Sequence, residues 1–268
     1  MTWKNYLNPS RLLGGIRRRG VLYLRKLTYR PGAKPINPKA VLFEAFEGKI
    51  VGDSPYEIFR HLRSVRPDLE FFWTVKPGVP APEGATPVTW ASRAWFEALA
   101  TSKYLVNNSN FPWYFRKVAG QIYLQTWHGT PLKRLGRDVG VDQFSALYQQ
   151  AMDREAAAWD YLIAPNDFCA ERFPSIFGYR GEQLVTGYPR NDRLSKTTDA
   201  QRQLIRADLG ITDPSQQLVL YAPTWREFNR TATGNWNTVN FFDPATTMPE
   251  GFTLLFRGHH NTHAAHTD

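Results

Sequence analysis

The chain has 268 residues, of which 42% are apolar and 14% aromatic, and its formal net charge is +9. This length suffices for one large domain or two small ones, and the composition excludes a largely disordered chain. No apolar run reaches about 18 residues, so no transmembrane helix is predicted. The single cysteine, Cys169, excludes an internal disulfide.

The positive charge is concentrated at the start of the chain, where no acidic residue precedes position 44. Residues 1–38 read as a basic amphipathic leader and a proline-containing connector. Such a segment can lie on an anionic membrane surface, here through residues 1–30. The alternative is a helix that packs on its own domain and exposes a basic face. No nucleic-acid partner is predicted, because the basic residues are confined to one end and no binding motif accompanies them.

Short apolar runs then alternate with helical patterns along the chain. The first strands are predicted at residues 40–46, 69–75, 102–108 and 121–125. Helices are predicted at 55–62, capped by Asp53 or Ser54, and from Ser92 onward. Further elements are a helix at 143–159, a strand at 161–164, a helix from 166 to 173, a strand at 183–186, a polar helix at 199–209, and strands at 217–222 and 252–256. This alternation predicts an α/β protein with parallel sheets.

Turn residues and a polar helix predict a domain junction near residues 190–212. The first domain would then cover residues 39–195, and a second would occupy residues 196–268. Only two clear strands belong to the second domain, and two strands do not make a stable doubly wound domain. We therefore expect this domain to be incomplete, in a fragment or a truncated gene product.

Polar clusters follow three predicted strands, at residues 126–130, 222–226 and 257–260. In open α/β sheets, such strand ends converge on one ligand crevice. A neutral histidine such as His128 can accept a proton near neutral pH, and arginines pair with phosphate oxygens. Taken singly, each of these residues has an ordinary structural or solvated alternative, and the pattern leaves the two interpretations balanced.

Other chemistries lack their signatures. The sequence contains neither a phosphate-binding P-loop nor the Gly-x-Ser-x-Gly elbow of a serine hydrolase. Four histidines lie at positions 259, 260, 263 and 266, but the last two sit in a polar tail without helix or strand pattern. We predict no metal site and no cofactor.

Four motifs occur in a fixed order, at residues 125–133, 187–192, 221–226 and 256–259. Their sequences are QTWHGTPLK, GYPRND, YAPTWR and FRGH, and together they resemble the CDP-glycerol glycerophosphotransferase family of teichoic-acid primases and polymerases. The resemblance implies a GT-B fold, in which two Rossmann-like domains face each other. It also implies transfer of glycerol phosphate, or a related alditol phosphate, from a CDP-alditol to an acceptor hydroxyl, with release of CMP.

The resemblance further implies a peripheral protein on the cytoplasmic face of the membrane, acting on a lipid-linked glycan or polyol-phosphate acceptor. Carried over by position, His128 is the expected general base and His259 the histidine that contacts the donor phosphates. Arg226 and Arg257 are expected to bind phosphate, and Thr130 and Lys133 to bind substrate. Asp192, in the junction motif, is expected to be structural.

Two departures from the family pattern stand out. His260 follows His259 where the family usually has proline, and an aspartate-tyrosine-serine-serine motif expected further along is absent. We therefore expect residues 1–268 to be weakly active or inactive. Two alternatives remain open: a GT-B glycosyltransferase that uses a nucleotide sugar, and a non-catalytic remnant that binds membranes.

Overall fold

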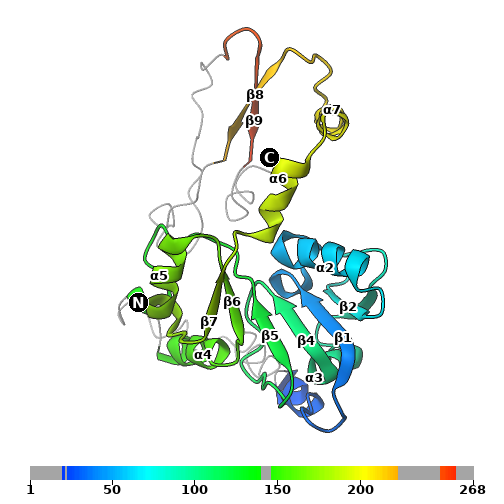
Figure 1. Ribbon diagram of the computed structural model, residues 1–268, viewed down its shortest axis with the longest axis vertical. Helices are drawn as coiled ribbons and strands as arrows, with labels where there is room; N and C mark the ends of the chain where they lie inside the picture. The colour runs from blue at the N-terminus through cyan, green and yellow to red at the C-terminus, as the bar shows by residue number, and fades with distance from the viewer. Residues whose placement is uncertain (1–19, 22, 140–145, 223–247, 258–268) are drawn as a thin grey trace, which may run out of the picture. The chain divides into compact units, whose positions relative to one another are not determined.

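The computed structural model describes residues 20–21, 23–139, 146–222 and 248–257. The chain divides into two compact units, residues 1–196 and residues 197–268 (Figure 1). Each unit is described by itself.

The first unit is built on a seven-stranded sheet in the order β3-β2-β1-β4-β5-β6-β7, and every neighbouring pair is parallel. Its strands are β1 (Asn37–Glu44), β2 (Glu70–Val75), β3 (Thr86–Thr89), β4 (Ser102–Asn107), β5 (Ile122–Gln125), β6 (Tyr161–Ala164) and β7 (Glu182–Val185). The strand order reverses between β1 and β4, which makes the carboxyl ends of these strands the expected ligand crevice of a doubly wound sheet.

Helices cover both faces of this sheet (Figure 1). They are α2 (Asp53–Val65), α3 (Arg93–Thr101), α4 (Ala146–Ala156) and α5 (Asp167–Phe177). The short 3-10 turns are η2 (Phe46–Gly48), η3 (Gly136–Asp138) and η4 (Pro189–Asn191), and the exposed helix α6 (Asp192–Lys196) follows η4. Alternation along β1 sends Val41 and Phe43 into the core beneath α2, and Leu42 into the core beneath α3, α4 and α5. The strands are therefore apolar on both faces, as a covered parallel sheet requires.

Local sequence explains most helix boundaries. Ser92 caps α3 by accepting a hydrogen bond from the Trp95 N–H, and Asn166 caps α5 in the same way from the Cys169 N–H. The predicted cap of α2 is wrong: its N-cap is Gly52, and no side chain caps that helix. Asp53 instead begins the helix, and its carboxylate pairs with Arg190.

The end predicted for α5 at residue 173 is also wrong, because the helix continues through Pro174 to Phe177. Proline in a helix interior loses a backbone hydrogen bond. Ile176 and Phe177 are almost completely buried, and their burial offsets that loss.

The described part of the leader is helical at residues 20–21 and 23–28. It is attached to the first unit through Tyr29, which is buried against Phe96 and donates a hydrogen bond to the Arg116 carbonyl. Val21, Tyr23, Leu24 and Leu27 are exposed. Among the described residues, no helix combines the length and the apolar character needed to cross a membrane.

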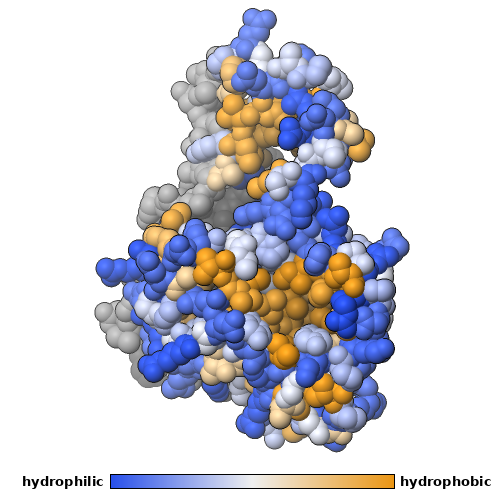
Figure 2. All heavy atoms as spheres, viewed as in Figure 1, coloured by the Kyte–Doolittle hydropathy of each residue, from blue (hydrophilic) through white to orange (hydrophobic). Residues whose placement is uncertain are grey.

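The second unit contains α7 (Asp199–Asp208) and a parallel pair of strands, β8 (Gln217–Tyr221) and β9 (Phe252–Phe256). A complete capping box starts α7: the Thr198 hydroxyl accepts from the Gln201 N–H, and the Gln201 side chain accepts from the Thr198 N–H. Apolar atoms gather on the surface of β8 and β9 (Figure 2), where Leu220 is 63% exposed.

Candidate functional site

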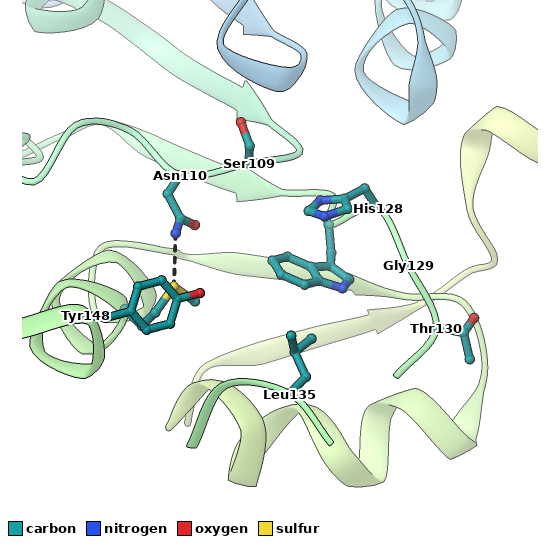
Figure 3. A pocket seen from close by; sticks show the side chains of 9 residues that line it. Ser109, Asn110, His128, Gly129, Thr130, Leu135 and Tyr148 are labelled. Atoms are coloured by element: carbon teal, nitrogen blue, oxygen red, sulfur yellow. Dashed lines mark hydrogen bonds between the residues drawn. The ribbon is translucent and has the colours of Figure 1, made fainter. Parts of the chain in front are cut away.

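His128 lies just beyond β5, at the carboxyl edge of the sheet and beside the end of β4 (Figure 3). The backbone N–H of Thr126 still donates to the Asn107 carbonyl, so the loop leaves the sheet only at Trp127. The structure therefore places His128 next to the point at which the strand order reverses.

A backbone carbonyl fixes the proton on the His128 ring. The Nδ1 atom lies 2.5 Å from the carbonyl oxygen of Asn108, and a carbonyl can only accept. Nδ1 must therefore carry hydrogen, which leaves the Nε2 lone pair of the neutral ring available. Within the described part of the chain, Nε2 has no hydrogen-bond partner. Asn108 is itself fixed, because its Oδ1 accepts the Phe46 N–H at 2.9 Å.

Burial lowers the pKa of His128 from its ordinary value of 6.5. The hydrogen bond to Asn108 and the carboxylate of Asp53 oppose this effect, and the guanidinium of Arg190 adds to it. The net direction is downward, so the imidazole is neutral at neutral pH. A neutral imidazole with a free Nε2 has the protonation state that a general base requires.

The residue before the histidine has a strained backbone. Trp127 has φ +53°, which a bulky residue rarely adopts. Its N–H donates to the Gln125 side-chain oxygen at 2.9 Å, and its ring packs edge-on against Phe177 with centroids 4.6 Å apart. These contacts hold the strained turn and so define where His128 projects.

The 187–192 motif contacts the same loop. Tyr188 donates its hydroxyl hydrogen to the Gly129 carbonyl at 2.8 Å, and Arg190 Nη1 donates to the His128 carbonyl at 2.9 Å. The same Nη1 lies 3.0 Å from Asp53 Oδ2. Asp192 starts α6 and contacts Lys196 on that helix.

Sequence reasoning missed Asp53, Asn108 and Arg190 as parts of this site. Arg190 lies within the 187–192 motif, one of the four that resemble the family, so its position was available as a signal. Asp53 was expected only as a helix cap. Asn108 contributes its backbone carbonyl to His128, which no side-chain pattern could reveal.

A cavity of about 380 Å³ opens beside His128 (Figure 3). Trp127, Leu135 and Met152 supply apolar walls, while polar groups come from Ser109, Asn110, Thr130 and Tyr148. Mixed walls of this kind suit a small ligand that carries hydroxyl groups.

The remaining predicted site residues are distributed as follows. Thr130 is exposed and lines the cavity, whereas Lys133 is exposed and is not part of its lining. Arg257 follows β9 in the second unit, where it is exposed and its N–H donates to the Tyr221 carbonyl at 3.0 Å. Arg226 and His259 lie outside the described residues. In the described part of the chain, no group of three or more histidine, cysteine, aspartate or glutamate side chains is arranged to hold a metal ion.

These features define a doubly wound α/β unit with a histidine at its carboxyl edge, and comparison with known proteins places the chain more closely. The profile of the family CDP-Glycerol:Poly(glycerophosphate) glycerophosphotransferase matches residues 28–267. The chain therefore belongs to this family, as the four motifs predicted.

Two curated relatives illustrate the similarity. The teichoic acid poly(glycerol phosphate) polymerase of Bacillus subtilis (strain 168) is 35% identical over 210 residues, which are 75% of this chain and 28% of that protein. The teichoic acid glycerol-phosphate transferase of Staphylococcus aureus (strain NCTC 8325 / PS 47) is 31% identical over 245 residues, 87% of this chain and 63% of that protein. The chain thus spans less than a third of the length of the Bacillus relative.

Among solved structures, the wall teichoic acid polymerase TagF matches with a TM-score of 0.77 and 29% identity, covering 99% of this chain and 67% of that chain. A TagF histidine variant soaked with CDPG matches with a TM-score of 0.78 over the same shares. These matches confirm the predicted GT-B-like α/β fold. The facing arrangement of two domains and their predicted boundaries stay predictions.

Proposed function

We propose that this protein transfers glycerol phosphate, or a related alditol phosphate, from a CDP-alditol to a hydroxyl group of a teichoic-acid-type acceptor. The acceptor oxygen forms a new bond to the phosphorus that carries the alditol. The bond from that phosphorus to the bridging oxygen of the pyrophosphate breaks, and CMP leaves with the electron pair. The proton of the acceptor hydroxyl passes to His128 Nε2.

The observation that carries this proposal is the hydrogen bond between His128 Nδ1 and the Asn108 carbonyl. It leaves the unprotonated nitrogen of a neutral imidazole at the carboxyl edge of the sheet. The adjoining cavity, with Asn110, Thr130 and Tyr148 among its lining residues, is large enough for a polyol and offers hydroxyl and amide partners to it.

The donor side of the proposal involves the second unit. Arg226, Arg257 and His259 would stabilise negative charge on the pyrophosphate, as cationic and hydrogen-bonding groups do in phosphoryl transfer. Thr130 and Lys133, on the His128 loop, would bind the substrate. The names of the relatives support this assignment, since they describe a poly(glycerol phosphate) polymerase and a glycerol-phosphate transferase, and one TagF structure was soaked with CDPG.

The nucleotide product tests the reaction type. Any CMP that the purified chain releases from CDP-glycerol in the presence of a glycerol-phosphate-primed acceptor should form in step with acceptor elongation. His128→Gln should abolish this release, whereas His61→Gln, on the exposed face of α2, should not change it. A nucleoside diphosphate formed from a nucleotide sugar would instead identify a glycosyltransferase. The weak or absent activity predicted for residues 1–268 stays a prediction, which the same assay tests against a full-length relative.

We further propose that the acceptor is lipid-linked and that the protein lies peripherally on the cytoplasmic face of the membrane. Support comes from the described end of the leader, where Tyr23, Leu24 and Leu27 are exposed beside Arg25 and Lys26. Apolar side chains interleaved with cations suit the interface of an anionic bilayer.

A further inference from the structure

Four residues around His128 adopt left-handed backbone conformations that are unusual outside glycine. They are Phe46 and Glu47 after β1, Asp53 at the start of α2, and Trp127 itself, with φ between +47° and +60°. Such conformations are strained and persist only where surrounding contacts hold them. The contacts that hold the His128 loop therefore determine where the imidazole lies.

Arg190 holds two of these segments together. Its Nη1 donates to the His128 carbonyl at 2.9 Å and lies 3.0 Å from the Asp53 carboxylate, which is 137 residues away in the sequence. The guanidinium also lies over the Tyr188 ring, at 4.6 Å from its centroid, while the Tyr188 hydroxyl bonds the Gly129 carbonyl. Tyr188, the N-cap residue of η4, and Arg190 within η4 thus hold the carbonyl groups of Gly129 and His128.

Arg190 and Asp53 carry opposite charges that offset each other beside His128. The Asp53 side chain is only 8% exposed, and among the described basic residues Arg190 alone pairs with it. The described charged groups that face the imidazole are Asp53 from α2 and Arg190 from η4, with opposite effects on its pKa. The β4 side contributes the Asn108 carbonyl, and the end of β1 contributes the Phe46 ring, 5.3 Å from the imidazole centroid.

We propose that Arg190 and Asp53 form a charge-balanced clasp that positions His128 for proton transfer, with Arg190 acting as a positioning residue. The clasp fixes the backbone of the loop and keeps the net charge beside the imidazole close to zero. This inference rests on the proposed function, in which His128 is the base. Loss of either partner leaves the other charge unpaired beside the ring.

Replacement of Arg190 and replacement of Asp53 should shift the pKa of His128 in opposite directions. Arg190→Gln leaves the buried Asp53 carboxylate unopposed, so it should raise the pKa of His128. Asp53→Asn leaves the guanidinium unopposed and should lower this pKa. The double variant should have a His128 pKa near the wild-type value, because both charges are gone. Arg190→Lys keeps a positive charge and should shift this pKa less than Arg190→Gln does.

Nuclear magnetic resonance titration of ¹³Cε1-labelled histidines measures these shifts without any need for activity, with His128→Gln used to assign the signal. Arg193→Gln is the matched control, since Arg193 is an exposed arginine that pairs with Glu57 on the same helix as Asp53. It should leave the His128 signal unchanged.

In the transfer assay, Arg190→Gln should lower kcat by roughly 10- to 100-fold, as misplacement of a catalytic group does, with a smaller change in KM. Shifts of the same sign in Arg190→Gln and Asp53→Asn, or no shift in either, would overturn the clasp. Opposite pKa shifts in Arg190→Gln and Asp53→Asn, together with CMP release that His128→Gln does not lower, would leave the clasp standing and contradict the proposed function instead.

Discussion

Neighbouring groups that take no direct part in proton transfer set the tautomer, the protonation state and the orientation of His128. The Asn108 carbonyl selects the tautomer, burial keeps the ring neutral, and Trp127 accepts a strained backbone so that the histidine projects from the sheet edge. The sequence predicted His128 from its place after an apolar run. It could not predict Asp53 and Arg190, because their contact joins residues 137 positions apart and depends on how α2 and η4 pack.

A second titratable residue lies beneath the same edge of the sheet. Glu44, the last residue of β1, is completely buried, and burial raises its pKa to about 8. Its Oε2 accepts a hydrogen bond from the Trp95 indole at 3.1 Å. Because the folded state holds the proton up to about pH 8 while the unfolded state releases it near its ordinary value of 4.5, stability falls as pH rises between these values.

Glu44→Gln, which mimics the protonated acid, should remove this dependence. The free energy of unfolding of the wild type, relative to the variant, should decline between about pH 5 and pH 8 by at most ~1.4 kcal/mol per pH unit. Urea titrations of both proteins at several pH values measure the difference, which cancels the contribution of other groups such as Glu155. A difference that stayed constant over this range would show that Glu44 titrates normally.

At the scale of elements, strands and helices followed from local pattern, since apolar runs and caps are signals carried by neighbouring residues. The helix starts at Ser92 and Asn166 were predicted correctly, because each side chain caps its own helix. The start of α2 was predicted wrongly, because Asp53 pairs with Arg190 in a distant turn and does not cap the helix. Tertiary contacts override local preference at the site, where the backbone is also strained.

The cap of α5 offers an element-level test. Replacement of Asn166 by alanine removes the acceptor of the Cys169 N–H and should lower the free energy of unfolding by about 1 kcal/mol. Asn166→Asp keeps an acceptor oxygen and should cost much less. Equal losses for the two variants, measured by urea denaturation, would contradict the capping role.

At the scale of the whole molecule, the leader and the two units have separate proposed tasks. If the leader binds an anionic bilayer, the chain should co-sediment with vesicles of phosphatidylglycerol and lose this binding as salt rises. Removal of residues 1–27 should abolish it, and neutral phosphatidylcholine vesicles are the control. Vesicle binding that changed neither with salt concentration nor with lipid charge would contradict an electrostatic anchor.

The central claim is that His128 is the base of the transfer reaction, and the pH dependence of CMP release measures this most directly. In the wild type, kcat should rise with pH through a pKa below 6.5 and level off near neutral pH, because only the neutral imidazole accepts the proton. His128→Gln should lose this acidic limb together with most of the turnover, while still binding CDP-glycerol. A variant that kept both the wild-type rate and the wild-type pH profile would contradict the account.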